Sequence, residues 1–139
     1  MRIMGIDFGE ARIGIAVSDP LGITAQAVET ICWNKEWKKP IERIEALIKA
    51  YPCDTIVVGF PVNMNGTIGE RGKRTQQFIN KLKHAFPEIK VVQWDERLST
   101  EQSKQALIEM GIRSRKHKGK IDQMSASFIL QSYMDANRT

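Results

Sequence analysis

The chain has few of the residues that bind transition metals and no long apolar segment. It contains two cysteines and two histidines in 139 residues. Cys32 and Cys53 have no C-x-x-C spacing, and neither histidine lies in an H-E-x-x-H arrangement, which argues against a zinc site or a disulfide framework. No run approaches the ~18 apolar residues of a membrane span, and no basic stretch followed by an apolar one opens the chain. These absences favour buried reduced thiols and a cytoplasmic protein without a membrane partner.

Positive charge exceeds negative charge, and the excess is concentrated in one segment. The formal net charge is +5, and the stretch RSRKHKGK at 113–120 is nearly all basic. A block of like charge this dense repels itself and is typical of a segment that binds a polyanion. We therefore expect a nucleic acid as partner. The predicted contacts to its phosphates are Arg113, Arg115, Lys116 and Lys118.

The hydrophobic pattern predicts an α/β protein with one mixed sheet and helices on its faces, in a single domain spanning 1–139. Strands are predicted where β-branched and apolar residues run or alternate, at 2–8, 13–17, 23–31, 54–59 and 90–94. Apolar residues at helical spacing predict helices at 41–48, 78–86 and 121–136, and the segment FPVNMNGTIGERG at 60–72 is predicted as a loop. A capping box, S-x-x-Q, begins at Ser99 and predicts a further helix that ends at Gly111.

Acidic residues follow two of the predicted strands. Asp7 lies at the end of the first strand, and Asp95 and Glu96 follow the fifth. Right-handed crossovers make the first, fourth and fifth strands parallel, so their carboxyl ends share one edge of the sheet. In open α/β sheets this edge is where ligands bind. We expect these acids to converge there.

A further acid lies in the last predicted helix. Asp122 is in its first turn and shares a helical face with Ala126, Ile129 and other apolar residues. If this face packs on the thin surface made by Gly14 and Ala16, Asp122 approaches the acids at the strand ends. Taken singly, each acid has another interpretation, since Asp122 also suits the positive end of a helix and the strand-end acids also suit solvent.

Carboxylates a few ångströms apart repel one another and raise their pKa values unless a cation neutralises them. Oxygen ligands with little nitrogen or sulfur suit Mg²⁺ or Mn²⁺, and magnesium commonly combines one or two carboxylates with water and substrate phosphate. The sequence therefore predicts Mg²⁺ or Mn²⁺ as the cofactor.

Four segments carry a family resemblance. They are GIDFGEARIGIAVSD, VVGFPVNMNG, WDERLST and KIDQMSA. In this order and spacing, and over nearly the whole chain, they resemble the YqgF/RuvX family, whose members are described as Holliday-junction resolvases and as pre-16S rRNA nucleases. The resemblance implies a ribonuclease H-like fold, with a five-stranded mixed sheet in the order 3-2-1-4-5 and helices on both faces. It also implies a metal-dependent nuclease that hydrolyses phosphodiester bonds during maturation of the 5′ end of pre-16S ribosomal RNA.

The resemblance also assigns roles to the acids. Asp7, Glu96 and Asp122 match the family's acidic positions, which implies that they are catalytic and hold the metal, and Asp95 is a weaker fourth ligand. The fourth strand departs from the wider ribonuclease H pattern, because it ends at Gly59 without an acid. That departure leaves a second metal ion in question.

Four other residues are candidate substrate contacts, each with a structural alternative. Gly9 lets a substrate backbone approach and Arg12 contacts it, or both serve only a hairpin. Arg97 binds a non-scissile phosphate through its planar fork, or it pairs with Asp95. Asn65 lies in a long loop of the kind that often carries function, or it forms a turn.

Other functions stay open. One is resolution of branched DNA, which requires a two-fold dimer for symmetric cutting. A second is a non-catalytic nucleic-acid-binding module. A protein that only binds a polyanion would bind it more tightly with neutral residues in place of the acids, which argues against this function. A third is an actin-like ATP-binding fold, suggested by the D-x-G at Asp7–Gly9, but such proteins pair two lobes and the chain supplies one. The choices between RNA and DNA and between monomer and homodimer are left open.

Overall fold

The computed structural model describes residues 1–63, 65–98 and 118–137, and five strands of this part form one sheet. The strands are β1 (Arg2–Phe8), β2 (Arg12–Ser18), β3 (Ala25–Cys32), β4 (Cys53–Phe60) and β5 (Lys90–Asp95). Their order in the sheet is β3-β2-β1-β4-β5. The first three strands form an antiparallel meander, whereas β1, β4 and β5 run parallel. The predicted strand order and mixed sheet are therefore confirmed.

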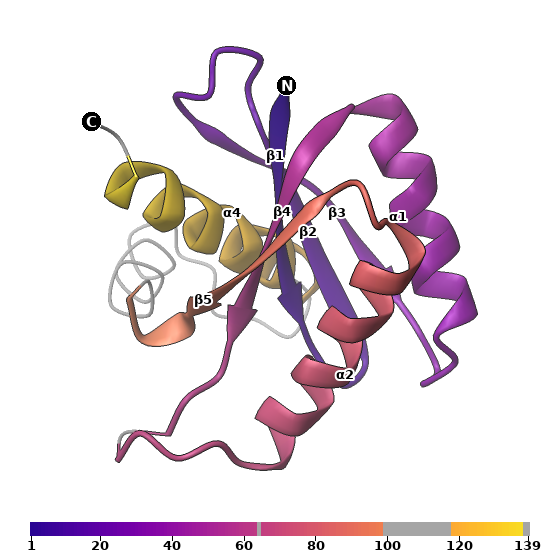
Figure 1. Cartoon of the computed structure of the whole chain (residues 1–139), viewed down its shortest axis with the longest axis vertical. Coiled ribbons are helices and arrows are strands. Elements are labelled where there is room, and N and C mark those ends of the chain that lie inside the picture. The colour runs from indigo at the N-terminus through magenta and orange to yellow at the C-terminus, as the bar shows by residue number, and fades with distance from the viewer. Residues whose placement is uncertain (64, 99–117, 138–139) are drawn as a thin grey trace.

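Helices cover both faces of the sheet, as the sequence predicts (Figure 1). Helices α1 (Lys38–Ala50) and α2 (Glu70–Ala85) pack on one face, and α4 (Lys118–Ala136) packs on the other. A single 3₁₀ turn, η1 (Glu96–Leu98), follows β5. The helix predicted from Ser99 to Gly111 lies outside the described residues. Among those that are described, no helix is long and apolar enough to cross a membrane.

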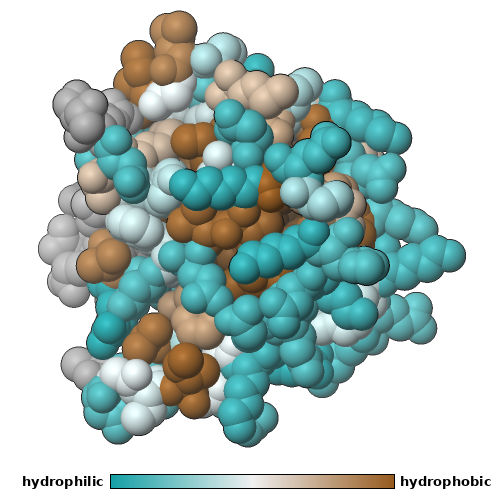
Figure 2. All heavy atoms as spheres, viewed as in Figure 1, coloured by the Kyte–Doolittle hydropathy of each residue, from teal (hydrophilic) through white to brown (hydrophobic). Residues whose placement is uncertain are grey.

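The face under α1 and α2 carries the larger apolar core. Alternate residues of β1 point into it, so that Met4, Ile6 and Phe8 are almost completely buried. The helices contribute buried residues at helical spacing, among them Ile44 and Leu82. Figure 2 shows hydrophilic side chains over the outer sides of these helices, with apolar atoms visible between them. Burial of these apolar helix residues holds both helices on the sheet.

An aromatic group surrounds the last residue of β1. The ring of Phe8 lies 4.6 Å from that of Phe78, 5.4 Å from that of Trp33 and 5.8 Å from that of Trp37, measured between centroids. Trp33 Nε1 donates a hydrogen bond to the carbonyl oxygen of Gly9 at 3.0 Å. Offset and tilted ring pairs of this kind add stability beyond their buried area. The backbone on both sides of Phe8 is thereby held in place at the carboxyl edge of the sheet.

The opposite face is thin where α4 crosses it. A Cβ atom on Gly14 would collide with the backbone carbonyl of Asp122, and one on Gly5 would lie 2.6 Å from the Cβ of Leu130. Ala16 and Ala126 are completely buried in the same layer. The packing of the last helix on the Gly14 and Ala16 surface is therefore as predicted.

Two details differ from the sequence predictions. Helix α2 begins at Glu70, eight residues before the predicted start at 78 and inside the segment predicted as a loop. Its first two turns are polar and contain Gly72, so they lack the apolar spacing that marks the rest of the helix. Both cysteines are free thiols, but only Cys53 is buried as predicted. Cys32 is exposed because it is the last residue of the edge strand β3 and alternates with the buried Ile31.

Replacing Gly14 by alanine tests the close approach of α4. The added Cβ would overlap the Asp122 carbonyl and push the helix from the sheet, so we expect a loss of about 1–3 kcal/mol or more in the free energy of unfolding. Urea denaturation measures it. Gly69→Ser is the matched control, because a Cβ there meets only Asn63 Nδ2 at 3.6 Å and serine suits the N-cap position of α2, so a change within about 0.5 kcal/mol is expected. Equal effects of both substitutions would contradict this packing.

Candidate active site

The fold brings the acids predicted from the sequence to one edge of the sheet. Asp7 is next to last in β1 and lies opposite Gly14 of β2, so its side chain is on the α4 face. Glu96 follows directly after β5, whose carboxyl end lies at the same edge because β1, β4 and β5 are parallel. Asp122 enters from α4, whose backbone touches the Gly14 position.

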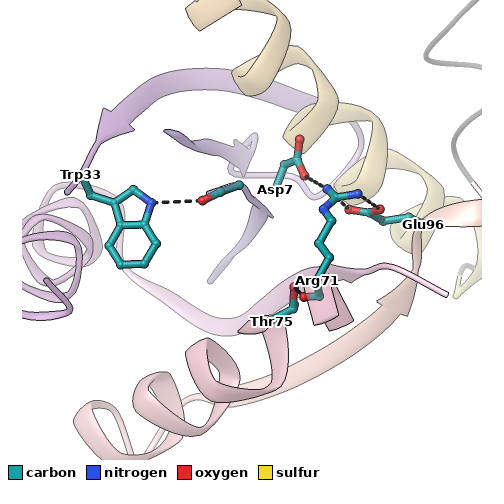
Figure 3. A network of polar contacts seen from close by, with 6 residues as sticks. Asp7, Trp33, Arg71, Thr75 and Glu96 are labelled. Atoms are coloured by element: carbon teal, nitrogen blue, oxygen red, sulfur yellow. Dashed lines mark hydrogen bonds and ion pairs between the residues drawn. The ribbon is translucent and has the colours of Figure 1, made fainter. Parts of the chain in front are cut away.

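Arg71 lies between two of these carboxylates. Its Nη2 atom is 3.9 Å from Asp7 Oδ1 and 3.3 Å from Glu96 Oε1, while Nη1 is 3.4 Å from Glu96 Oε2. Figure 3 shows the guanidinium reaching from α2 to both acids. The Asp7 and Glu96 side chains are 16% and 19% exposed, whereas that of Arg71 is 54% exposed. The two acids are therefore largely enclosed and share one cation that faces solvent.

The surroundings of Asp7 favour its protonated form. Burial, and after it the charge of Glu96, raises the pKa of Asp7 from 3.8 to about 7. The positive charge of Arg71 acts in the opposite direction, and the charge of Asp122 raises the pKa further. Burial and the charge of Glu96 together thus outweigh the guanidinium, and the ionised Asp7 carboxylate is unfavourable without a further cation. The site attracts further positive charge.

Asp122 forms a separate pair. Arg12 Nε donates to Asp122 Oδ2 at 2.6 Å, and both side chains are partly buried. Arg12, predicted as a substrate contact or a hairpin residue, therefore binds an acid in this structure. Within residues 1–63, 65–98 and 118–137, no three side chains of His, Cys, Asp or Glu are grouped so that they could hold a metal ion. Arg71 thus contacts Asp7 and Glu96 together, whereas Arg12 contacts Asp122 alone.

The lack of an acid at the end of β4 has a steric counterpart. A Cβ atom at Gly59 would lie 2.5 Å from Ile129 Cδ1 and 3.1 Å from Glu96 Cγ. A side chain at this position would collide with Ile129 Cδ1 and press on the Glu96 side chain. The glycine therefore provides the space into which the Glu96 carboxylate extends toward Asp7.

Asp95 is engaged by its neighbour Arg97. Arg97 Nη2 donates to Asp95 Oδ2 at 2.6 Å, and the Arg97 backbone N–H donates to Asp95 Oδ1 at 2.9 Å. The side-chain hydrogen bond from Arg97 lowers the pKa of Asp95. The ion pair that was the alternative for Arg97 is thus present, and the carboxylate predicted as a weaker fourth ligand points to this arginine.

The remaining predicted contacts lie in turns or outside the described residues. Gly9 accepts the Trp33 hydrogen bond, and a Cβ on it would lie 2.5 Å from the carbonyl oxygen of Arg12, which fits a tight β1–β2 hairpin. Asn65 Oδ1 accepts hydrogen bonds from the backbone and hydroxyl of Thr67 and so stabilises a turn. Arg113, Arg115 and Lys116 lie outside the described residues, and the Lys118 side chain is likewise not described.

Arg71 was missed in the sequence because it lies in a segment predicted as a loop. The missing information was the start of α2. The helix that follows β4 in a right-handed crossover starts near the carboxyl edge of the sheet, where Asp7 and Glu96 lie. An arginine in its first turn then faces the acids. A cavity of about 230 Å³ adjoins it and is lined by Asn63, Arg71, Glu96 and Arg97, among others.

A mixed sheet in this order, with acids at the carboxyl edge, defines a ribonuclease H-like protein. Solved structures agree on the fold. The structure of Thermus thermophilus RuvC in complex with a Holliday junction substrate superposes with a TM-score of 0.59 at 18% identity, covering 99% of this chain and 96% of that one. The fowlpox virus Holliday junction resolvase gives 0.56 at 19% identity, covering 98% and 99%.

The sequence identifies the family within this class. Residues 1–136 match the family model described as "RuvX: Holliday junction resolvase", and the chain belongs to this family. A relative from Acetivibrio thermocellus, named "Putative pre-16S rRNA nuclease", is 49% identical over 136 residues, which are 98% of this chain and 96% of the relative. The resemblance stated from the four motifs is confirmed, and the chain is a nuclease, a hydrolase acting on ester bonds.

The raised pKa of Asp7 predicts a pH dependence of stability without metal. The unfolded chain releases the Asp7 proton near 3.8 and the folded protein near 7, so the folded state binds more protons between these values. Stability should therefore fall as pH rises from about 4 to about 7, by at most about 1.4 kcal/mol per unit from this group, and then level off. Asp7→Asn should remove this slope and be at least as stable as wild type above pH 7. Urea denaturation with a chelator present measures the free energy of unfolding of wild type and of Asp7→Asn at each pH. If both depend on pH in the same way, the raised pKa does not belong to Asp7.

Proposed function

We propose that this protein is a divalent-metal-dependent nuclease that matures the 5′ end of pre-16S ribosomal RNA in the cytoplasm. Two findings support the substrate: the relatives' shared name, "Putative pre-16S rRNA nuclease", and coverage of nearly the full length of both chains. The single structural observation that carries the chemistry is the Asp7 and Glu96 pair at the carboxyl edge of the sheet, held by one half-exposed cation.

The pair of Asp7 and Glu96 fits Mg²⁺ or Mn²⁺, because magnesium commonly combines one or two carboxylates with water and substrate phosphate. The candidate ligands Asp7, Glu96 and Asp122 offer only carboxylate oxygens, which these hard cations prefer. Burial, and after it the negative charge of Glu96, raises the pKa of Asp7, and a divalent ion would neutralise the charge of both carboxylates. When bound, such ions activate a water and stabilise the leaving oxygen of a phosphodiester.

The protein's own groups would then act as follows. Asp7 and Glu96 would hold the cation, and the aromatic group around Phe8 keeps the Asp7 backbone fixed. Asp122 would be a third ligand if Arg12 released it, and the Arg12 guanidinium would then be available for a substrate phosphate. Arg97 stays with Asp95 or moves to a non-scissile phosphate.

A four-way DNA junction is the second candidate substrate. The family description names a Holliday junction resolvase, and this observation favours testing branched DNA beside RNA. The two substrates differ in what they demand, because symmetric cutting of a junction requires a two-fold dimer. The same assay therefore includes both substrates, and the oligomeric state of the protein is measured alongside.

Substitution of the acids tests the proposal. Asp7→Asn, Glu96→Gln and Asp122→Asn should each lower Mn²⁺-dependent cleavage of labelled pre-16S RNA by on the order of 100-fold or more, because each removes charge that holds the cation. Asp54→Asn is the control. Its side chain is exposed at the start of β4, away from the carboxyl edge, and its cleavage rate should equal that of wild type. Cleavage by Asp7→Asn at the wild-type rate would reject the assignment.

The basic segment at 113–120 predicts a salt dependence. Neutralising Arg113, Arg115, Lys116 and Lys118 should weaken RNA binding without base preference, and each lost phosphate contact should flatten the log–log salt dependence by roughly 0.7 to 0.9. Fluorescence anisotropy at several salt concentrations gives the slope. Neutralising the exposed Lys81 and Lys83 on α2 is the control. An unchanged slope after the first substitutions would mean that the segment does not touch the backbone.

A further inference from the structure

The pair of Asp7 and Glu96 has a cation of the protein's own. Arg71 contacts both carboxylates at 3.3–3.9 Å (Figure 3), and its positive charge lowers the pKa of Asp7 against the effect of burial. A divalent ion held by the same two carboxylates would carry twice the charge of the guanidinium and would compete with it for the same oxygens. Binding of the ion and the Arg71 ion pairs are therefore opposed.

The contacts of Arg71 are loose compared with other ion pairs in the protein. Arg43 donates to Glu29 at 2.6 and 2.7 Å, and Arg97 donates to Asp95 at 2.6 Å. The contacts of Arg71 are longer, and its side chain is 54% exposed. The guanidinium faces solvent, but the two carboxylates are largely enclosed and need a counter-charge. The Arg71 guanidinium can thus leave at low cost only when another cation takes its place.

The backbone of Arg71 is fixed while its side chain is not. Thr75, which is completely buried, donates from Oγ1 to the Arg71 carbonyl oxygen at 2.9 Å. The next residue, Gly72, is buried so closely that a Cβ on it would collide with Ile68 and lie 3.3 Å from the carbonyl oxygen of Pro61. The first turn of α2 is therefore anchored on the chain that leaves β4. Movement of the guanidinium requires only rotation of the Arg71 side chain.

A place for the released guanidinium lies next to the acids. The cavity of about 230 Å³ beside Glu96 is lined by Arg71 and Arg97 and by the amide-bearing Asn63. Arg97 already pairs with Asp95, and Asn63 Nδ2 donates to Thr67 Oγ1 at 3.0 Å. The donor that would become available for a phosphodiester oxygen is therefore the Arg71 guanidinium. The cavity borders Glu96. A phosphate bound in it would therefore lie next to the scissile phosphodiester, which the proposed metal would hold at Asp7 and Glu96.

We propose that Arg71 is an exchangeable countercation: without metal it neutralises Asp7 and Glu96, and with metal bound it turns into the adjacent cavity and binds a phosphate of the substrate strand. The inference rests on the proposed metal-dependent nuclease function and assigns a residue and a phosphate subsite to it. It predicts effects of opposite sign for one substitution. Loss of Arg71 should strengthen the binding of metal and weaken the binding of substrate.

The first measurement is Mn²⁺ binding to the protein without nucleic acid, by isothermal titration calorimetry. Arg71→Gln should bind Mn²⁺ roughly two- to fivefold more tightly than wild type, because no guanidinium competes for the carboxylates. Its melting temperature without metal should be lower than that of wild type, and its rise on addition of Mn²⁺ should be larger. Arg71→Lys keeps the charge but cannot span both acids with a planar fork. Its Mn²⁺ affinity should lie between those of wild type and Arg71→Gln.

The second measurement is steady-state cleavage of labelled pre-16S RNA at saturating Mn²⁺. Arg71→Gln should raise KM by about tenfold through the lost phosphate contact. Arg43→Gln is the matched control, since it removes an arginine with a two-point carboxylate pair on α1, which covers the face of the sheet opposite to Asp7, and it should change neither Mn²⁺ affinity nor KM. A merely structural role of Arg71 would not tighten Mn²⁺ binding while raising KM.

Arg71→Gln with Mn²⁺ affinity equal to or below that of wild type would overturn the proposal, and so would tighter Mn²⁺ binding with an unchanged KM. These failures are distinguishable from failure of the proposed function. If wild type binds Mn²⁺ and cleaves RNA while Asp7→Asn does neither, the metal-dependent nuclease stands whatever Arg71→Gln shows. If wild type neither binds Mn²⁺ nor cleaves, both proposals fall.

Discussion

Repulsion between two enclosed carboxylates is the constraint on which the site depends. Parallel pairing of β1, β4 and β5 places Asp7 and Glu96 at the same edge, and both side chains are more than four-fifths buried. Enclosed charges of one sign are unfavourable unless a cation or a proton offsets them. The protein uses both, since Arg71 contacts the pair and the pKa of Asp7 rises to about 7. A site that needs positive charge in this way is suited to bind metal and the backbone of a polyanion.

Small residues make this convergence possible. Gly14 lets the backbone of α4 approach β2 at Asp122, and Gly59 leaves the space in which the Glu96 side chain lies. Packing disfavours an acid at the end of β4, because a side chain there would collide with Ile129 Cδ1 and press on the Glu96 side chain. The layers are tight where the acids meet, and a volume change at either glycine would reach the charged groups directly.

Much of the fold was predictable because its signals are local or follow from topology. Alternation and β-branched runs marked all five strands, and the right-handed crossover rule placed Asp7 and Glu96 at one edge. The polar first turn of α2 carried no periodic signal, so Arg71 was missed. The pairing of Arg12 with Asp122 could not be read from the sequence, because their contact spans 110 positions and depends on how closely α4 lies on β2.

The class of fold, the family and the three candidate acids could therefore be predicted from the amino-acid sequence. They follow from hydrophobic spacing, strand order and the order of the motifs, none of which requires coordinates. The distribution of cations among the acids emerged from packing alone. Arg71 lies with Asp7 and Glu96, Arg12 with Asp122, and Arg97 with Asp95. Such partners are chosen by distances of a few ångströms and by burial, and neither quantity exists until helices and sheet are packed together.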